Sequence, residues 1–368
     1  MTDNAATVVI DNGSITTRGG FSENEIPHTV FPSVFGVSRA RDTRLTYVGE
    51  EALLKQKDLN LSYPIEHGIV IDWNAVEEIW RHIFYKELCI DPVDHPVLLT
   101  EALFNSKPNR ETMIQVMFER FSPPAFYVAS QPVLSLYSTG RTNGIVLESG
   151  DSATHAVPVY EGYALLHSTI RSDFTGSGLT DQLMKNLTES GYSFTTPEER
   201  GVVRAIKEKL CYVAQDYEQE IQTIAPPTVD HQYELPDGQV ITLGQERFRY
   251  AEAFFQPSVI GLEGVGVHEI VFNAIEKCDR DLRRDMFRNI VLAGGTTLLP
   301  GFTNRLRTQF HSISFEKTRG ARIVSAYEKD AAWVGGSVLA SLPTFKDMWC
   351  TRQEYDDAGA SIVHRKCF

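Results

Sequence analysis

The apolar positions of this chain follow two alternating periods. A β-branched run at residues 8–10 ends at the polar sequence Asp-Asn-Gly-Ser, residues 11–14. Because Asn-Gly is a strong hairpin signal, we expect a strand, a tight turn and a returning strand here. An apolar run, a carboxylate, a small residue and a glycine follow one another again at residues 145–151. This repetition at half-chain distance predicts an internal duplication and hence two related lobes.

Other apolar residues recur with the 3.6-residue period of helices that pack one face on a sheet. Such stripes run through residues 76–84, 203–213 and 270–282, and we expect a helix in each. A further helix is expected from Pro300 onward. Strands and helices therefore alternate, which predicts an α/β fold.

A third glycine turn, Ala-Gly-Gly-Thr at residues 293–296, closes the apolar run at residues 290–292. Glycines let backbone amides approach a ligand closely. Three such turns, each at the end of an apolar strand, predict convergence on one nucleotide cleft. Residues 37–46 are polar and unpatterned, and residues 225–228 contain Pro-Pro, so both segments predict exposed loops.

Composition narrows the function further. The formal net charge of -13 opposes attraction to phosphate backbones, so we expect no direct nucleic acid binding. The five cysteines are scattered and form no C-x-x-C pair, which predicts neither a disulfide framework nor a zinc site and fits a reducing compartment. No apolar run approaches the roughly 20 residues that span a bilayer, so no membrane insertion is expected.

Many segments of the chain resemble the actin family, and the resemblance runs essentially end to end. The matching segments are residues 10–14, 62–68, 96–102, 109–111, 140–142, 157–163, 206–211, 333–337 and 361–368. The resemblance implies a two-lobed actin-like ATPase fold, with duplicated mixed-sheet domains around a nucleotide cleft. It also implies four subdomains. These are residues 1–32, 64–138 and 331–368 (subdomain 1), 33–63 (subdomain 2), 139–174 and 264–330 (subdomain 3), and 175–263 (subdomain 4).

The resemblance further implies that the cleft holds ATP or ADP with Mg²⁺ or Ca²⁺. Asp11 and Glu148 match carboxylates that contact the cation through water. Gln131 and His155 match the pair that positions the attacking water, and their alternative role is that of satisfied polar residues near the lobe junction. The residues that match nucleotide-binding positions are Asp11, Asn12, Gly13, Ser14, Arg18, Gly150, Asp151, Gly176, Lys207, Glu208, Gly294, Gly295, Thr296 and Lys329.

The chain departs from the family pattern in both phosphate loops. Ile15 stands in place of a glycine and Arg18 in place of a lysine, while Glu148 replaces an aspartate and Ser152 a glycine. A β-branched residue does not readily take a positive φ, and an arginine fork differs in shape from an ammonium. We therefore expect altered and slow hydrolysis, with compensated drift as the alternative.

Of the two surfaces that the family uses in assembly, one departs from the family pattern in this chain and the other keeps it. The loop at residues 37–46 is shorter and more basic than the family's filament-contacting loop, which predicts weak self-assembly. The groove between subdomains 1 and 3, by contrast, keeps its apolar lining and predicts a partner site. Its lining residues are Tyr137, Tyr163, Leu339, Leu342, Thr344 and Met348.

These features predict a divergent actin or actin-related protein with weak or lost ATPase activity. It would be a structural subunit of a dynein-arm or dynactin-like complex, bound through the groove to other actin-family subunits or to other proteins of the assembly. A chromatin-remodelling complex is another candidate of this kind. The cytoplasm or cytoskeleton, including the axoneme, is the expected location, and the nucleus stays open. The rival hypothesis is a polymerising actin with an ATP-hydrolysis cycle. A sugar kinase of the same superfamily is a weaker third, which the actin-like carboxyl terminus disfavours.

Overall fold

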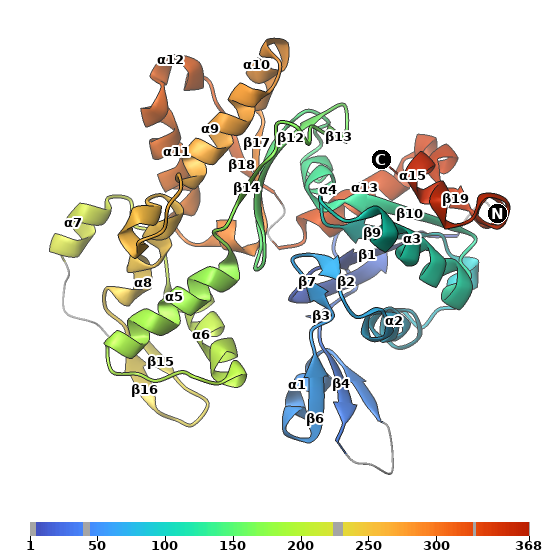
Figure 1. The fold of residues 1–368 in the computed structure, drawn as a ribbon, viewed down its shortest axis with the longest axis horizontal. Coiled ribbons are helices and arrows are strands. Elements are labelled where there is room, and N and C mark those ends of the chain that lie inside the picture. The colour runs from blue at the N-terminus through green and yellow to red at the C-terminus, as the bar shows by residue number, and fades with distance from the viewer. Residues whose placement is uncertain (1–4, 40–44, 224–230, 327–328, 368) are drawn as a thin grey trace. The chain divides into compact units, whose positions relative to one another are not determined.

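The chain forms two units, each with its own sheet and core (Figure 1). The computed structural model describes residues 5–39, 45–223, 231–326 and 329–367. Unit 1 consists of Met1–Thr142, Glu161–Ala164 and Lys329–Phe368, and unit 2 of Asn143–Tyr160 and Leu165–Glu328. The division of each lobe into two subdomains stays a prediction.

The main sheet of unit 1 has six strands in the order β19-β10-β9-β1-β2-β3. Strand β1 forms the predicted hairpin with β2 and pairs in parallel with β9, which pairs in parallel with β10. The strands are β1 (Val8–Asn12), β2 (Thr16–Phe21), β3 (Thr29–Pro32), β9 (Val97–Glu101), β10 (Ala125–Ser130) and β19 (Cys350–Thr351). The smaller strands are β4 (Phe35–Ser38), β5 (Thr46–Val48), β6 (Leu59–Ser62), β7 (Ile65–Glu66), β8 (Ile69–Val70) and β13 (Tyr163–Ala164).

One of the predicted apolar stripes lies in unit 1 and packs in the core formed with this sheet. The predicted stripe at residues 76–84 lies in α2 and the π-helical turn Ile83–Glu87 that continues it. Asp72 begins α2, because its side chain accepts a hydrogen bond from the Ala75 amide. The helices are α1 (Glu50–Leu54), α2 (Trp73–His82), α3 (Lys107–Val116), α4 (Gln131–Tyr137), α13 (Ala331–Ser341), α14 (Arg352–Ala358) and α15 (Val363–Lys366).

Helix α13 brings the carboxyl-terminal part of the chain into the core of unit 1. Trp333 is fully buried and its indole Nε1 donates a hydrogen bond to the Val9 carbonyl at 3.0 Å. A Cβ atom at Gly335 would collide with the Leu134 carbonyl of α4, so only glycine allows this approach of the two helices. The amino-terminal strand and α13 therefore share one packed core.

The sheet of unit 2 repeats the central topology of the first. Strand β11 forms the second predicted hairpin with β12 and pairs in parallel with β17, which pairs in parallel with β18. Strand β14 pairs with β12. The duplication predicted from the two hairpins is thus present in the strand order. The strands are β11 (Gly144–Ser149), β12 (Thr154–Tyr160), β14 (Ile170–Ser172), β15 (Gln232–Glu234), β16 (Val240–Thr242), β17 (Ile290–Ala293) and β18 (Ile323–Ser325).

The helices of unit 2 end earlier than the apolar stripes predicted. The stripe at residues 203–213 outlasts α6, which ends at Leu210, so Val213 is a buried loop residue. The stripe at residues 270–282 is split because Cys278 turns to an extended conformation (φ -71°, ψ 158°) between α9 and α10. The helix expected from Pro300 begins at Phe302. The helices are α5 (Gly176–Glu189), α6 (Pro197–Leu210), α7 (Tyr217–Gln222), α8 (Glu246–Arg249), α9 (Val267–Lys277), α10 (Arg280–Arg288), α11 (Phe302–Ile313) and α12 (Phe315–Thr318).

The two expected loops are described only in part. Val37 and Ser38 belong to β4 and Thr46 to β5, so the ends of the segment 37–46 are strands rather than loop. Residues 40–44 and the whole of residues 225–228 lie outside the described residues. Among the helices that the structure describes, none is long and apolar enough to cross a membrane.

Candidate functional site

The first glycine hairpin carries a buried ion pair. Strands β1 and β2 set Asp11 directly opposite Arg18, and cross-strand neighbours of opposite charge attract. Arg18 Nη1 lies 3.1 Å from Asp11 Oδ2, and Arg18 Nε lies 2.6 Å from Asp330 Oδ1 just before α13. Asp11 and Arg18 are both buried. The Arg18 guanidinium is therefore held between two carboxylates, which offset the cost of burying its charge.

The other oxygen of Asp11 is also occupied by protein groups. Asp11 Oδ1 accepts hydrogen bonds from Thr100 Oγ1 at 2.7 Å and from Gln131 Nε2 at 2.9 Å. Gln131 begins α4 and Thr100 lies in β9, so three elements meet at this carboxylate. The structure thus brings Asp11, Arg18 and Gln131 together.

The turn residues between the strands are fixed mainly by the protein itself. The Asn12 carboxamide accepts from Trp80 Nε1 at 2.9 Å and donates to the Thr100 carbonyl at 3.3 Å, so its side chain anchors the turn to the core. The Gly13 carbonyl accepts from Ser33 Oγ at 2.6 Å. Ser14 Oγ accepts from the Gly68 amide at 2.9 Å. A ligand at this turn would therefore meet mainly backbone.

The divergent turn residues do not adopt the positive φ that a β-branched side chain disfavours. Neither Ile15 nor Ser152 is among the described non-glycine residues with positive φ. The turn accepts Ile15 because its backbone stays in a region open to β-branched residues. The change of residue at position 15 thus alters the side chain offered at the turn and leaves the backbone unstrained.

The second and third glycine turns come together in unit 2. The Gly176 amide, at the start of α5, donates to the Gly150 carbonyl at 3.0 Å, and the Ser177 amide donates to the Asp151 carbonyl at 2.7 Å. Thr296 Oγ1 donates to the same Gly150 carbonyl at 3.1 Å. A Cβ at Gly176 would lie 2.8 Å from Thr296 Oγ1, so this contact needs a glycine. Two of the three predicted glycine turns thus lie together in unit 2, while the first belongs to unit 1, and their convergence on one nucleotide cleft stays a prediction.

A buried lysine stands behind this cluster. Lys207 of α6 donates from Nζ to the Gly176 carbonyl at 2.6 Å and to Thr180 Oγ1 at 2.8 Å. Burial lowers the pKa of Lys207 to about 8, although the charge of Asp151 opposes that shift. Removing the ammonium from water is unfavourable, so an anion bound nearby would stabilise the charged form.

His155 lies on β12 between two charged neighbours in register. It pairs in register with Glu148 of the neighbouring strand β11 and with Arg171 of β14. Burial, and secondarily the positive charge of Arg171, lowers the pKa of His155 to about 4. The imidazole is therefore neutral at physiological pH. Gln131 belongs to unit 1 and His155 to unit 2, so each is described within its own unit.

The remaining predicted nucleotide residues lie at the edges of these loops. Glu208 is exposed on α6 beside Lys207, Gly295 begins the short 3₁₀ turn Gly295–Leu298, and Lys329 is exposed next to Asp330. Each is therefore adjacent in sequence to a residue that organises a loop. Their roles toward a ligand stay predictions.

The described residues do not form a direct metal site. Among them there is no group of three His, Cys, Asp or Glu side chains arranged to hold a cation. Asp11, the carboxylate expected to face the cation, already has both oxygens bonded to protein groups. A cation would therefore depend on phosphate oxygens and water for most of its ligands, as Mg²⁺ commonly does.

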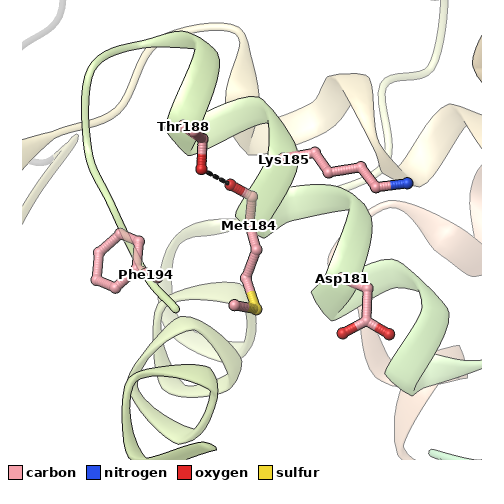
Figure 2. A pocket seen from close by; sticks show the side chains of 5 residues that line it. All are labelled: Asp181, Met184, Lys185, Thr188 and Phe194. Carbon is pink, nitrogen blue, oxygen red and sulfur yellow. Dashed lines mark hydrogen bonds between the residues drawn. The ribbon is translucent and has the colours of Figure 1, made fainter. Parts of the chain in front are cut away.

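An open pocket of about 370 Å³ lies elsewhere in unit 2, against α5 (Figure 2). Met184 and Phe194 form its apolar part, and Asp181, Lys185 and Thr188 complete the lining. Asp181 is paired with Arg200 at 2.8 Å. The pocket contains none of the predicted nucleotide residues and is separate from the glycine cluster.

The residues predicted for the partner groove lie in unit 1. Tyr163 is 55% exposed and Leu342 46% exposed, while Tyr137, Leu339 and Met348 are half-buried against the core. Burial raises the pKa of Tyr137, and Tyr163 adds to that shift. Thr344 is exposed in the turn between α13 and β19.

The sequence did not reveal three residues that organise these loops. Thr100 bonds Asp11 and the Asn12 amide, and its place at the carboxyl end of a buried strand beside β1 was a usable signal. Thr180 Oγ1 accepts a hydrogen bond from Lys207, which also donates to the Gly176 carbonyl. Asp330 pairs with Arg18 across 312 positions of sequence, and no local pattern points to it.

Comparison with known families decides the relationship of the chain. The family model described as Actin matches residues 2–368. The chain belongs to the actin family. The predicted family and fold class are thereby confirmed. Proteins of the actin family are typically cytoskeletal and typically bind a nucleotide and a divalent cation.

For this actin-family protein, the buried neutral His155 predicts a specific pH dependence. Its pKa is about 4 in the folded chain and 6.5 without burial, so between these values the unfolded chain binds a proton that the folded chain does not. The free energy of unfolding should fall as pH drops from 6.5 to 4, by up to about 3 kcal/mol from this residue.

Chemical denaturation of wild type and His155→Gln at several pH values measures this effect. The glutamine variant should lose less stability over the window, whereas His167→Gln, which changes an exposed histidine of the same unit, should behave as wild type. Parallel curves for wild type and His155→Gln would contradict the assignment.

Proposed function

We propose that this actin-family protein binds ATP or ADP at its glycine loops and is a structural subunit of a cytoskeletal or motor-associated complex. A dynein-arm or dynactin-like assembly in the cytoplasm or cytoskeleton is the kind of complex intended. The proposal rests on one observation. The Gly150 carbonyl accepts hydrogen bonds from the Gly176 amide and from Thr296, and the buried Lys207 donates to the Gly176 carbonyl.

Nucleotide binding is supported by the helix dipole and the buried positive charge that unit 2 places beside its glycines. Helix α5 has 14 residues, and its amino end abuts the β11–β12 turn. The dipole of such a helix favours negative charge at its amino end, where the amides of residues 176–179 are themselves hydrogen-bonded within the protein. Lys207 adds a buried cation whose charged form a phosphate would stabilise. Together these groups suit the polyphosphate of a nucleotide.

Slow or lost hydrolysis is supported by the surroundings of Arg18. Phosphoryl transfer depends mainly on positioning and on positive charge that stabilises the phosphate oxygens. Here one guanidinium is shared by Asp11 and Asp330, which together carry more negative charge than Arg18 offsets. Arg18 would therefore contribute little to a developing phosphate charge while both pairs persist.

A divalent cation, Mg²⁺ or Ca²⁺, is part of the proposal as a companion of the nucleotide. Bound to the phosphates, it would supply charge neutralisation for the nucleotide oxygens. Asp11 and Glu148 are the carboxylates proposed to contact its water shell. Contact through water, rather than direct coordination, is proposed because both oxygens of Asp11 already accept hydrogen bonds from the protein.

Association with protein partners is proposed through the groove residues of unit 1. Exposed leucine and tyrosine side chains next to a buried aromatic core suit the apolar face of an amphipathic helix. Other actin-family subunits, or other proteins of the assembly, are the proposed occupants. Neither membrane insertion nor nucleic acid binding forms part of the proposal.

Nucleotide binding is tested by replacing the buried lysine. Lys207→Met should weaken ATP binding at least about tenfold, equivalent to ~1.4 kcal/mol, because it removes the cation beside Gly176. The measurement is extraction of nucleotide from purified protein, followed by titration of the emptied protein with ATP. Lys209→Met changes an exposed lysine of the same helix and should leave binding unchanged. Wild-type protein that is stable, empty and indifferent to ATP would refute the proposed ligand.

Turnover is tested at the carboxylate that holds Arg18. Asp330→Asn keeps a hydrogen-bond acceptor and removes one negative charge, so phosphate release from ATP should become several-fold faster. Asp347→Asn removes an exposed carboxylate of the same unit and should leave the rate unchanged. An equal rate in wild type and Asp330→Asn would show that the Asp330 pair does not limit hydrolysis.

Assembly is tested by sedimentation and by partner capture. Under salt conditions that polymerise conventional actin, most of the protein should stay in the supernatant, because the short segment at residues 37–46 would bring its arginines into a dry filament contact. Leu342→Asp should reduce co-purification of partner subunits at least about tenfold. Leu54→Asp, at an 85% exposed leucine of α1, is the matched control. Abundant filaments would favour the rival function of a polymerising actin.

A further inference from the structure

Two buried thiols meet near the carboxyl end of unit 1. Cys350 Sγ and Cys367 Sγ lie 3.9 Å apart, and both side chains are at most 1% exposed. Both cysteines are reduced in the structure. Residues 351–366 separate them in the chain and form α14, a 3₁₀ turn and α15.

The backbone holds each thiol in place. Cys350 lies in β19, the edge strand of the six-stranded sheet, and pairs in register with Phe126 of β10. The Cys367 amide donates to the Val363 carbonyl at 2.9 Å, and its carbonyl accepts from Arg110 Nη2 at 3.1 Å. A disulfide requires the sulfurs to lie about 2 Å apart, so the two would have to approach each other by roughly 2 Å.

The pair is chemically asymmetric. A hydrogen bond from the Cys367 thiol, aided by the charges of Lys366 and Arg110, lowers the pKa of Cys350. Burial raises the pKa of Cys367 well above its usual range. Because thiolates are the nucleophiles of thiol oxidation, this asymmetry favours Cys350 as the sulfur that an oxidant meets first.

We propose that Cys350 and Cys367 are a reversible redox site, in which a peroxide converts the buried dithiol to an intrachain disulfide. The inference stands on the contact between the two sulfurs and is independent of nucleotide binding. It adds a modification site to a chain whose cysteine spacing alone suggested no disulfide.

Hydrogen peroxide is the oxidant in this reaction. The Cys350 thiolate attacks one peroxide oxygen, the O–O bond breaks, and hydroxide leaves, giving a sulfenic acid. The Cys367 sulfur then attacks the Cys350 sulfur, the S–O bond breaks, and the sulfenic oxygen leaves as water with the thiol proton. In total, two thiols and one peroxide give one disulfide and two waters. A small oxidant suits this site because both sulfurs are buried.

Oxidation would attach the carboxyl-terminal segment covalently to the edge strand. In the reduced state Cys367 is held there by hydrogen bonds and packing, and the disulfide would close a loop containing α14 and α15. Such a closure restricts the opening of this segment, since a cross-link removes conformations from the open ensemble.

The full-length wild-type protein is exposed to graded hydrogen peroxide, unfolded with a mass-tagged maleimide, and its free thiols are counted by intact mass. Two of the five thiols should disappear together, a peptide map should join residues 350 and 367, and a reductant should restore all five. Five persistent thiols, or oxidation of Cys367 to a sulfinic acid without a cross-link, would overturn the proposal.

Variants separate this pair from the other cysteines. Cys350→Ala should reduce the cross-linked fraction at least about tenfold, whereas Cys278→Ala, at a buried cysteine of unit 2, should leave it unchanged. Cys89→Ser removes the exposed thiol and should also leave the cross-link unchanged. A cross-link that persists in Cys350→Ala would overturn the assignment. The wild-type peptide map decides the matter even where a variant fails to fold.

Discussion

The polar ends of two buried strands have to be satisfied from within the protein, and both loops are built around that requirement. Strand β1 is buried along its whole length, so Asp11 at its end obtains its hydrogen bonds from Arg18, Thr100 and Gln131. In unit 2 the Gly150 carbonyl is bonded by the Gly176 amide and Thr296. An unpaired buried polar group would cost about 1–3 kcal/mol, which explains why each loop recruits several elements.

Local signals in the sequence predicted the elements, and tertiary packing decided where they end. The Asn-Gly turn and the apolar runs were sufficient for the hairpins, since a tight turn is specified by its own residues. The helix ends at Leu210 and Cys278 were missed, because apolar side chains such as Val213 continue the core after the backbone has left the helix. The pattern of apolar residues indicates which side chains are buried, but it does not indicate where the backbone hydrogen bonds of a helix end.

At the candidate site, too, the sequence indicated individual residues but not their contacts with residues far away in the chain. The glycines and Lys207 were found from sequence, and the structure joins them within unit 2. The state of Arg18 was not predictable in this way, because one of its two carboxylates lies 312 positions further along the chain. A residue's identity therefore indicated a charge at the loop, while its partners determine how much of that charge a ligand would experience.

The bond between Val9 and Trp333 also constrains how the chain is made. The two residues are 324 positions apart, so during synthesis β1 emerges long before the helix that covers it. Unit 2 lies in a single stretch interrupted only by residues 161–164, whereas unit 1 needs both ends of the chain. In a nascent chain, the part of the unit 1 core that α13 covers would stay exposed until residues 331–341 have left the ribosome. Contacts so distant in sequence slow folding and prolong exposure to aggregation, so unit 1 is the later and more vulnerable half to mature.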